Sequence, residues 1–251
     1  MTNEIVLERN ESYDASKLNC WDFCKKTDIK EGIEIKLGNM LNDFPFTVNG
    51  VTFKCSEMLY LCGEFSNNDE ESIQIQKDII ASNNGYIAKK IIKNKHKDKI
   101  RADFNAFRVQ WMLWVVWQKT KGNNAFQKLL LSIPDDAVII ENSSWQTSAT
   151  AKVWGCKNME LKRARAKVKK EIINSNEGMK KKDVEKLLSV ELNKVTGVGT
   201  FVGENNMGKI LMLCREALLK KTEPNINYEL LSEHDIYLFG IKLFVTKNPN
   251  T

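Results

Sequence analysis

The sequence predicts a mainly α-helical fold, organised as a single multihelical domain with minor short β elements and a charged helical insertion. Three observations lead to this prediction. Of the 251 residues, 42% are apolar and 28% are charged, a composition typical of globular proteins and not of disordered or fibrous chains. Apolar residues recur at three- and four-residue steps in several long segments, as they do in amphipathic helices. Segments with the alternating pattern of a strand are few and short.

The clearest helical segment is Asp103–Lys119, which we expect to be the central helix. Its apolar residues occupy more than one face, so this helix should be buried, and its tryptophans should belong to the core rather than to a substrate site. Four further helices are expected, over residues 57–65 with Ser56 as the N-cap, 73–81, 126–131 and, strongly amphipathic, 207–218.

The β elements are expected to be minor. Phe46–Phe53 has the pattern of a strand pair, and Asn49-Gly50 lies where a tight hairpin turn requires positive φ angles. The remaining strand predictions are residues 33–37, the buried segment 137–141 and a strand pair within 236–245.

We expect residues 1–251 to form one domain with a core at 37–219, an insertion at 157–200 and a C-terminal extension at 221–251. Two highly charged helices fit between Met159 and about Lys194, with a break near residues 174–178. A glycine-rich loop over residues 196–203 should then lead into the amphipathic helix.

The positive charge of the chain is local. The net charge is +6, and the lysines and arginines gather in residues 89–101 and 157–194. Such clusters raise the affinity for phosphate polyanions through counterion release, although a solvated helix surface accounts for them equally well. Charge alone therefore leaves contact with nucleic acid open.

Histidine and cysteine usage limits the possible chemistry. The chain has two histidines and six cysteines, and no two cysteines form a Cys-x-x-Cys pair. We therefore expect no metal, no cofactor and no disulfide framework, and chemistry that depends on carboxylates. The longest apolar run, residues 111–117, is far shorter than the ~20 residues that span a bilayer, and no charged-then-apolar leader opens the chain. A cytoplasmic protein without a membrane partner is expected, of undetermined oligomeric state.

Six short motifs follow one another in a fixed order. They are Leu37-Gly-Asn39, Phe44-Pro-Phe with Gly50, Ser56-Glu57, Arg101 with Phe104, Trp154-Gly155, and Gly203-x-Asn205-x-Met207-Gly208 with Leu211, Met212 and Arg215. In this order they resemble the NADAR family, also called YbiA-like, over roughly residues 37–219. The resemblance implies a mainly helical single domain with N-glycosidase activity, on riboflavin-pathway intermediates in some members and on ADP-ribosylated guanine of nucleic acid in others.

The resemblance also implies a set of site residues. Glu57 takes the place of the catalytic carboxylate, and Trp154 that of an aromatic residue on which a base can stack. Three basic residues, Lys89, Lys90 and Arg101, are candidate phosphate contacts because of their charge, although a solvated surface accounts for them equally well. The complete set of expected substrate-binding residues is Asn39, Lys90, Arg101, Phe104, Trp154, Gly155, Gly203, Asn205 and Gly208.

The chemistry of the reaction explains why a carboxylate is needed. Breaking an N-glycosidic bond builds positive charge on the anomeric carbon, while the departing nitrogen needs a proton. Glu57 lies in the first turn of its helix, where the helix dipole favours the ionised form, so we expect it to act as a base or to stabilise the cation. A second carboxylate could come from Glu64, Glu141 or Glu204. The helix entrance at Gly208-Lys209 is a further place where phosphate could bind.

The sequence differs from the family pattern in three places. Met58-Leu59 stand in place of His-Tyr, Glu64 in place of a lysine, and Ala151 in place of an acidic residue. The leading prediction is removal of ADP-ribose from guanine in nucleic acid, a reaction suited to toxin reversal or phage counter-defence. Two alternatives remain: an N-glycosidase on ribosylamino-pyrimidine phosphates, and a non-catalytic protein that binds nucleotides or nucleic acid.

Overall fold

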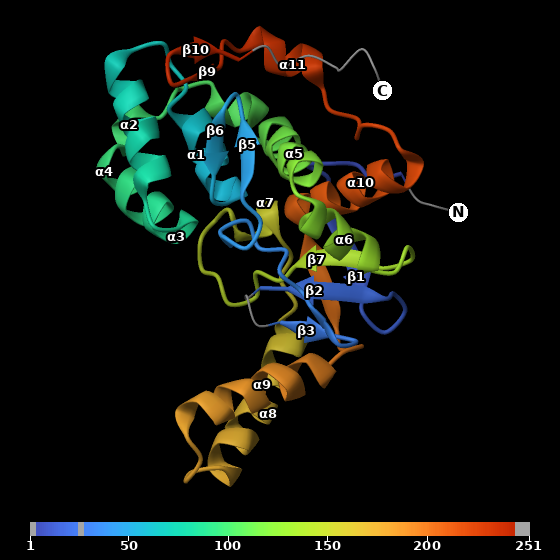
Figure 1. The fold of residues 1–251 in the computed structure, drawn as a ribbon. Helices are drawn as coiled ribbons and strands as arrows, with labels where there is room; N and C mark the ends of the chain where they lie inside the picture. Colours follow the sequence, from blue (N-terminus) through green and yellow to red (C-terminus); the bar gives the residue numbers. More distant parts are fainter. Residues whose placement is uncertain (1–3, 25–27, 244–251) are drawn as a thin grey trace. The chain divides into compact units, whose positions relative to one another are not determined.

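A computed structural model describes residues 4–24 and 28–243 (Figure 1). About half of the described residues are helical, and the strands are few and short, which confirms the prediction of a mainly α-helical fold. Among these residues, no helix combines the length and the apolar character needed to span a bilayer.

The chain folds into two compact units, each assembled from two stretches of sequence. The first unit consists of Met1–Gly38 and Ser132–Met212, and the second of Asn39–Leu131 and Leu213–Thr251. The prediction of one domain over residues 1–251, with its core at 37–219, an insertion at 157–200 and an extension at 221–251, stays a prediction.

The first unit contains paired short strands. β1 (Glu11–Asp14) pairs antiparallel with β8 (Thr200–Gly203), and β2 (Cys20–Phe23) pairs parallel with β7 (Val138–Glu141). The sequence predicts β7 but not the other three strands. β1 and β2 lie in a region without a clear strand or helix periodicity, and β8 lies within the predicted glycine-rich loop at residues 196–203. The core against which these strands pack consists of Tyr13, Cys20, Ile140, Cys156, Leu161 and Phe201.

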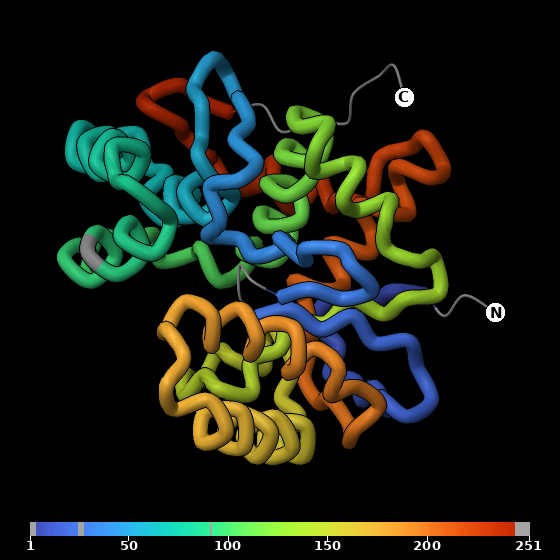
Figure 2. Tube along the Cα trace, turned by 60° about the horizontal axis from the view of Figure 1, so that its bottom comes forward, coloured from blue at the N-terminus to red at the C-terminus, as the bar shows by residue number. Residues whose placement is uncertain are grey.

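The charged segment forms the helical hairpin that the sequence predicts. α8 (Met159–Ser175) and α9 (Lys181–Lys194) lie side by side in Figures 1 and 2 and contact each other. Arg165 of α8 forms a bidentate ion pair with Asp22 of β2, with N–O distances of 2.5 and 3.0 Å. This pair connects the helical hairpin to strand β2 within the first unit. Arg165 Nε also donates to the Leu192 carbonyl of α9 at 3.1 Å.

In the second unit, α5 (Phe104–Gly122) confirms the predicted buried central helix. Its tryptophans belong to the core: Trp111 has no exposed surface, and its indole donates to the Tyr60 carbonyl at 3.2 Å. Around it are α1 (Ser56–Glu64), α2 (Glu70–Ala81), α6 (Asn124–Ser132) and α11 (Tyr228–Glu233), while α10 (Asn206–Lys220) contains residues of both units.

The lysine-rich segment of the second unit changes helix type along its length. It begins as α3 (Gly85–Ile87) and passes into a π-helix, η1 (Ala88–Ile92). It then continues as α4 (Lys93–Lys95) and a 3₁₀ turn, η2 (Lys97–Lys99). A π turn inside a helix changes the direction of the side chains that follow it and is often found at functional sites.

The β-hairpin prediction is confirmed, and the prediction of the N-cap of α1 needs correction. β5 (Phe46–Val48) and β6 (Val51–Phe53) pair across Asn49 and Gly50, whose φ angles are 48° and 77°. Ser56 is the first residue of α1 and not its cap; Cys55 occupies the cap position without a side-chain hydrogen bond.

The other strand predictions hold only in part. Of residues 33–37, only β4 (Ile33–Glu34) is a strand, paired with β3 (Ile29–Lys30). The predicted C-terminal pair is present as β9 (Tyr237–Leu238) and β10 (Ile241–Lys242), and the end of its predicted range, residues 244–245, lies outside the described residues.

Candidate functional site

Helix α1 carries two buried carboxylates on one face. Glu57 and Glu64 are separated by seven residues, which is close to two full helical turns, so both side chains leave the helix in nearly the same direction. Each side chain is only 3% exposed. Buried carboxylates are rare unless they are paired or hydrogen-bonded, so their surroundings decide their chemistry.

Glu57 is held by partners on both of its oxygens. Asn39 Nδ2 donates to Oε2 at 3.1 Å, and the Asn39 carbonyl accepts from the Glu57 backbone N–H at 3.0 Å. On the other side, Lys89 Nζ forms an ion pair with Oε1 at 2.8 Å. The structure therefore brings together Asn39 and Glu57, both predicted as site residues, and Lys89, which the sequence suggests as a phosphate contact.

Glu64 has its own lysine. Lys93 Nζ donates to Glu64 Oε1 at 2.8 Å. Lys89 lies within η1, and Lys93 follows it directly as the first residue of α4, so the π turn separates the two lysines that meet the two carboxylates. We call the set Asn39, Glu57, Glu64, Lys89 and Lys93 the carboxylate–lysine cluster.

Burial determines the electrostatics of the cluster. It raises the pKa of Glu64, and the negative charge of Glu57 adds to this effect, while Lys93 opposes it. Burial also raises the pKa of the Tyr60 hydroxyl well above its usual range, with further contributions from Glu64 and Glu57. The cluster therefore combines a carboxyl that keeps its proton to higher pH than usual with a second carboxylate paired to lysine.

Phe104 contacts Tyr60, which lies between Glu57 and Glu64 on helix α1. The two rings meet edge to face with centroids 5.3 Å apart, and Phe104 is 4% exposed. Its contacts with Tyr60 and Phe107 explain its position by core packing. Its predicted role in substrate binding stays a prediction.

Arg101 and Lys90, two of the predicted phosphate contacts, differ in how far their side chains are exposed and already paired. Arg101 pairs with both oxygens of Asp103 at 2.6 and 2.7 Å, and its Nη1 donates to Ser66 and to the Asp235 carbonyl at 2.9 and 2.8 Å. With a side chain that is 8% exposed, Arg101 links segments of the second unit and has little capacity left for a ligand. Lys90, in contrast, is exposed, with its ammonium 5.7 Å from the centroid of the Tyr86 ring.

Close packing explains the three glycines that were predicted as site residues, all of which lie in the first unit. A Cβ on Gly155 would lie 2.1 Å from Ser143 Oγ and 2.3 Å from the Glu141 carbonyl oxygen. On Gly203 it would lie 2.4 Å from the Gly155 carbonyl oxygen, and on Gly208 2.2 Å from that of Ile139. No side chain fits at these distances, so the three glycines are needed by the fold whether or not a ligand approaches them.

Asn205 completes the edge of β7. It has a φ of 53° and no exposed surface, its Nδ2 donates to the Ile139 carbonyl at 2.8 Å, and its Oδ1 accepts from the Glu141 N–H at 3.1 Å. The structure thus gathers Gly155, Gly203, Asn205 and Gly208 around the end of β7 and the start of α10.

Lys209 is bound to the chain itself. Its ammonium donates to the carbonyls of Val6 and Arg9, both at 2.7 Å, lies 3.2 Å from Glu11 and is 1% exposed. The expectation that Lys209 holds a phosphate therefore needs correction, because a phosphate would have to displace these partners. Trp154 is half-buried at the end of α7 (Ala151–Trp154). Its expected pairing with Glu57 joins residues of different units and stays a prediction.

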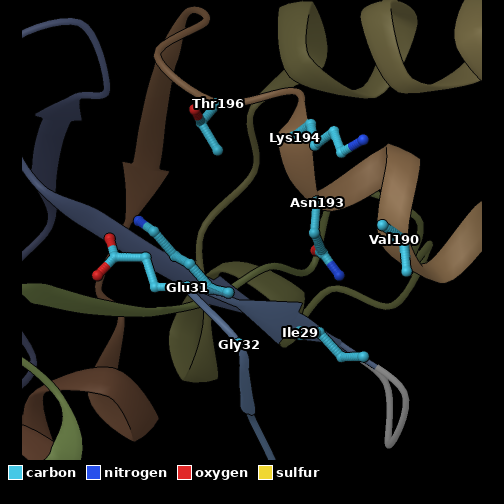
Figure 3. A pocket seen from close by; sticks show the side chains of 8 residues that line it. Ile29, Glu31, Gly32, Val190, Asn193, Lys194 and Thr196 are labelled. Carbon is cyan, nitrogen blue, oxygen red and sulfur yellow. The ribbon is translucent and has the colours of Figure 1, made fainter.

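A pocket of about 370 Å³ lies elsewhere in the first unit (Figure 3). The pocket is lined on one side by Ile29 of β3 and Glu31 of the β3–β4 turn. On the other side it is lined by Asn193, near the end of α9, and by Thr196 beyond it. None of the site residues predicted from sequence lines this pocket, and it has no pair of buried titratable groups like that of the carboxylate–lysine cluster.

The possible metal ligands of the described residues are dispersed, and several thiols are buried. Within residues 4–24 and 28–243, no three His, Cys, Asp or Glu side chains come together as a possible metal site. All six cysteines are free. Burial raises the pKa of Cys20 to about 11 and those of Cys156 and Cys214 to about 12, so these thiols remain protonated and weakly nucleophilic at neutral pH.

Gly85 keeps the lysine-bearing segment close to Glu57, and this leads to a prediction. A Cβ there would lie 2.8 Å from Cys55 Sγ and 3.1 Å from both Glu57 Cβ and Met40 Cα. We expect Gly85→Ala to lower the free energy of unfolding by about 1–3 kcal/mol, the usual cost of overpacking. Chemical denaturation measures this change. Gly178→Ala is the control, because nothing lies within 4 Å of a Cβ at Gly178; equal stability of both variants would contradict the prediction.

Sequence comparison identifies neither a matching family model nor a curated relative. The functional assignment therefore depends on the motifs and on the geometry of the carboxylate–lysine cluster.

Proposed function

We propose that this protein is an N-glycosidase that hydrolyses the bond between ribose and a nitrogen of a nucleobase. The observation that carries the proposal is the buried Glu57 carboxylate, held by Asn39 on one oxygen and by Lys89 on the other. A fixed anion in a site of low dielectric is the group that stabilises a developing positive charge most effectively. The resemblance of the ordered motifs to the NADAR family supports the same reaction.

In this proposal Glu57 acts as the base that stabilises the cation, and Glu64 acts as the general acid. The bond between the anomeric carbon and the base nitrogen breaks, and its electron pair leaves with the nitrogen. Glu57 stabilises the resulting oxocarbenium ion and accepts a proton from the water whose oxygen bonds to the anomeric carbon. Glu64, which keeps its proton to higher pH because it is buried, protonates the departing nitrogen. Asn39 orients Glu57 through its 3.1 Å hydrogen bond.

The substrate we favour is ADP-ribose attached to guanine in nucleic acid. The resemblance suggests this class, and the exposed basic side chains of α8 suit a polymeric anion better than a free nucleotide. Removing ADP-ribose from nucleic acid would reverse the action of a modifying toxin and would serve a phage as counter-defence. Ribosylamino-pyrimidine phosphates are the alternative substrate.

One observation favours a second function, binding without turnover. Both carboxylates of the cluster already have a lysine at 2.8 Å, so each negative charge is largely neutralised by the protein itself. A ribose cation would have to compete with Lys89 for Glu57. If Lys89 does not move, the protein binds nucleotides or nucleic acid and leaves the glycosidic bond intact.

Incubation of the purified chain with guanine-ADP-ribosylated oligonucleotide tests the proposal. We expect free ADP-ribose and unmodified oligonucleotide, both detected by mass spectrometry. A parallel reaction with a ribosylamino-pyrimidine phosphate identifies the alternative substrate. If the modified oligonucleotide binds and no product forms from either compound, the binding function is correct and the glycosidase proposal is wrong.

A further inference from the structure

Trp145 is unusual among the tryptophans of the described chain. It is 51% exposed, whereas the others are buried or half-buried. It lies in a turn of the first unit, closed by the Gln146 N–H, which donates to the Ser143 carbonyl at 2.9 Å. An indole buries a large apolar area when it is covered, so a tryptophan held in solvent is a candidate contact for a flat apolar partner.

The turn that carries Trp145 is firmly anchored. Ser144 is 3% exposed, and its hydroxyl donates to Asn142 Oδ1 at 2.6 Å and accepts from the Asn158 N–H at 2.8 Å. Asn158 in turn caps α8, because its Oδ1 accepts from the Leu161 N–H at 2.9 Å. One buried polar network therefore fixes both the turn and the start of α8, so Trp145 is held in place before any partner binds.

The solvent side of α8 is basic. The inward side carries Leu161, Arg165, Val168 and Ile172 at helical spacing, of which Leu161 is buried and the others are half-buried. On the remaining surface, no ion pair within residues 4–24 and 28–243 involves Arg163, Lys167, Lys169 or Lys170, all of which are exposed. Lys162 joins this basic surface to the turn, with its ammonium 4.8 Å from the centroid of the Trp145 ring.

We propose that Trp145 and the basic face of α8 bind single-stranded nucleic acid. We call these residues, Trp145, Lys162, Arg163, Lys167, Lys169 and Lys170, the Trp145–α8 surface. A base would stack on the indole, and the adjoining phosphates would be neutralised by the lysines and arginine along the helix. Single strands fit best, because the bases of a duplex are stacked on one another and offer no open face to an indole on a surface turn.

This binding does not depend on catalysis by the carboxylate–lysine cluster. An acidic protein would use the same positive charges, but it would gain little from a rigid exposed indole. The contribution of Trp145 to affinity therefore separates the two kinds of partner.

Fluorescence anisotropy of a labelled, unmodified single-stranded oligonucleotide tests the proposal on the full chain. We expect Trp145→Ala to weaken binding about tenfold or more, the effect of losing one stacked base, and Trp145→Phe to recover part of the loss. Tyr86→Ala is the matched control, because Tyr86 is 59% exposed and also has a lysine near its ring, at 5.7 Å, but lies in the second unit. Its binding should equal that of the parent chain.

Salt dependence tests the charged part of the surface. Lys167→Gln combined with Lys170→Gln should flatten the slope of log Kd against log salt by about 0.7 per lost phosphate contact. Unchanged affinity of Trp145→Ala, equal affinity for duplex, or equal competition by polyglutamate would overturn the proposal. Retained binding of single strands without release of ADP-ribose would contradict only the glycosidase function.

Discussion

Glu57→Gln is expected to reduce the rate of ADP-ribose release by about 10²–10⁴-fold, the usual contribution of a positioned acid or base. The amide keeps the size of the side chain and can still accept the hydrogen bond from Asn39, but it carries no charge to stabilise the ribose cation. Lys89 loses its ion pair with Glu57, and because its side chain is 43% exposed, its ammonium can be hydrated at little cost. Single-turnover kinetics measure the rate, and thermal unfolding verifies that the variant folds.

Glu64→Gln distinguishes the two carboxylates. In our proposal Glu64 must be protonated to act, so the activity of the parent chain should fall as pH rises through the pKa of Glu64, which burial raises. Glu64→Gln should be slower and should lose this alkaline decline in kcat/KM. If both variants retained the parent rate and its pH profile, the cluster would have no catalytic role.

Arg165→Gln is expected to lower the free energy of unfolding by about 3–5 kcal/mol, the usual cost of removing one partner of a buried ion pair. Asp22 is 9% exposed and would keep a buried charge, hydrogen-bonded by Asn142 Nδ2 at 2.8 Å but without its bidentate arginine. The link from α8 to the Leu192 carbonyl of α9 would also be lost. Urea denaturation followed by circular dichroism measures the change.

Two variants test the origin of this effect. Arg163→Gln removes a neighbouring arginine from the exposed side of α8 and should change stability by less than about 0.5 kcal/mol. Asp22→Asn combined with Arg165→Gln removes both charges and should recover a substantial part of the loss, because no uncompensated charge remains. Additive losses in the double variant would show that Arg165 acts through packing and not through Asp22.

Helices could be predicted from the sequence where apolar or charged residues recur at helical spacing over a long segment. α5 has apolar residues on several faces, and α8 and α9 are charged with a clear break, so their type and approximate ends followed from the pattern. The strands β1, β2 and β8 could not be predicted, because none has more than two consecutive apolar residues, whereas the predicted strand β7 begins with three. The π turn of η1 also has no sequence pattern of its own.

Part of the candidate site was accessible from sequence, and part was not. Glu57 and Asn39 followed from the motifs, and Glu64 was one of three possible second carboxylates. The pairing of Lys89 and Lys93 with these carboxylates depends on the course of the chain from α3 to α4, which spacing alone does not reveal. The sequence also does not show that Arg101 and Lys209 already bind groups of the protein itself. Phosphate binding by Arg101 stays a prediction.

The crowded glycines have a consequence for classification. A Cβ at Gly155, Gly203 or Gly208 would lie 2.1–2.4 Å from backbone or hydroxyl oxygens of the same chain, so natural selection for foldability alone would retain these glycines. A search profile weighted on these glycines would collect proteins that share an architecture, including pseudoenzymes. In our proposal, the glycosidase activity of a homologue depends instead on the residues equivalent to Asn39, Glu57 and Lys89.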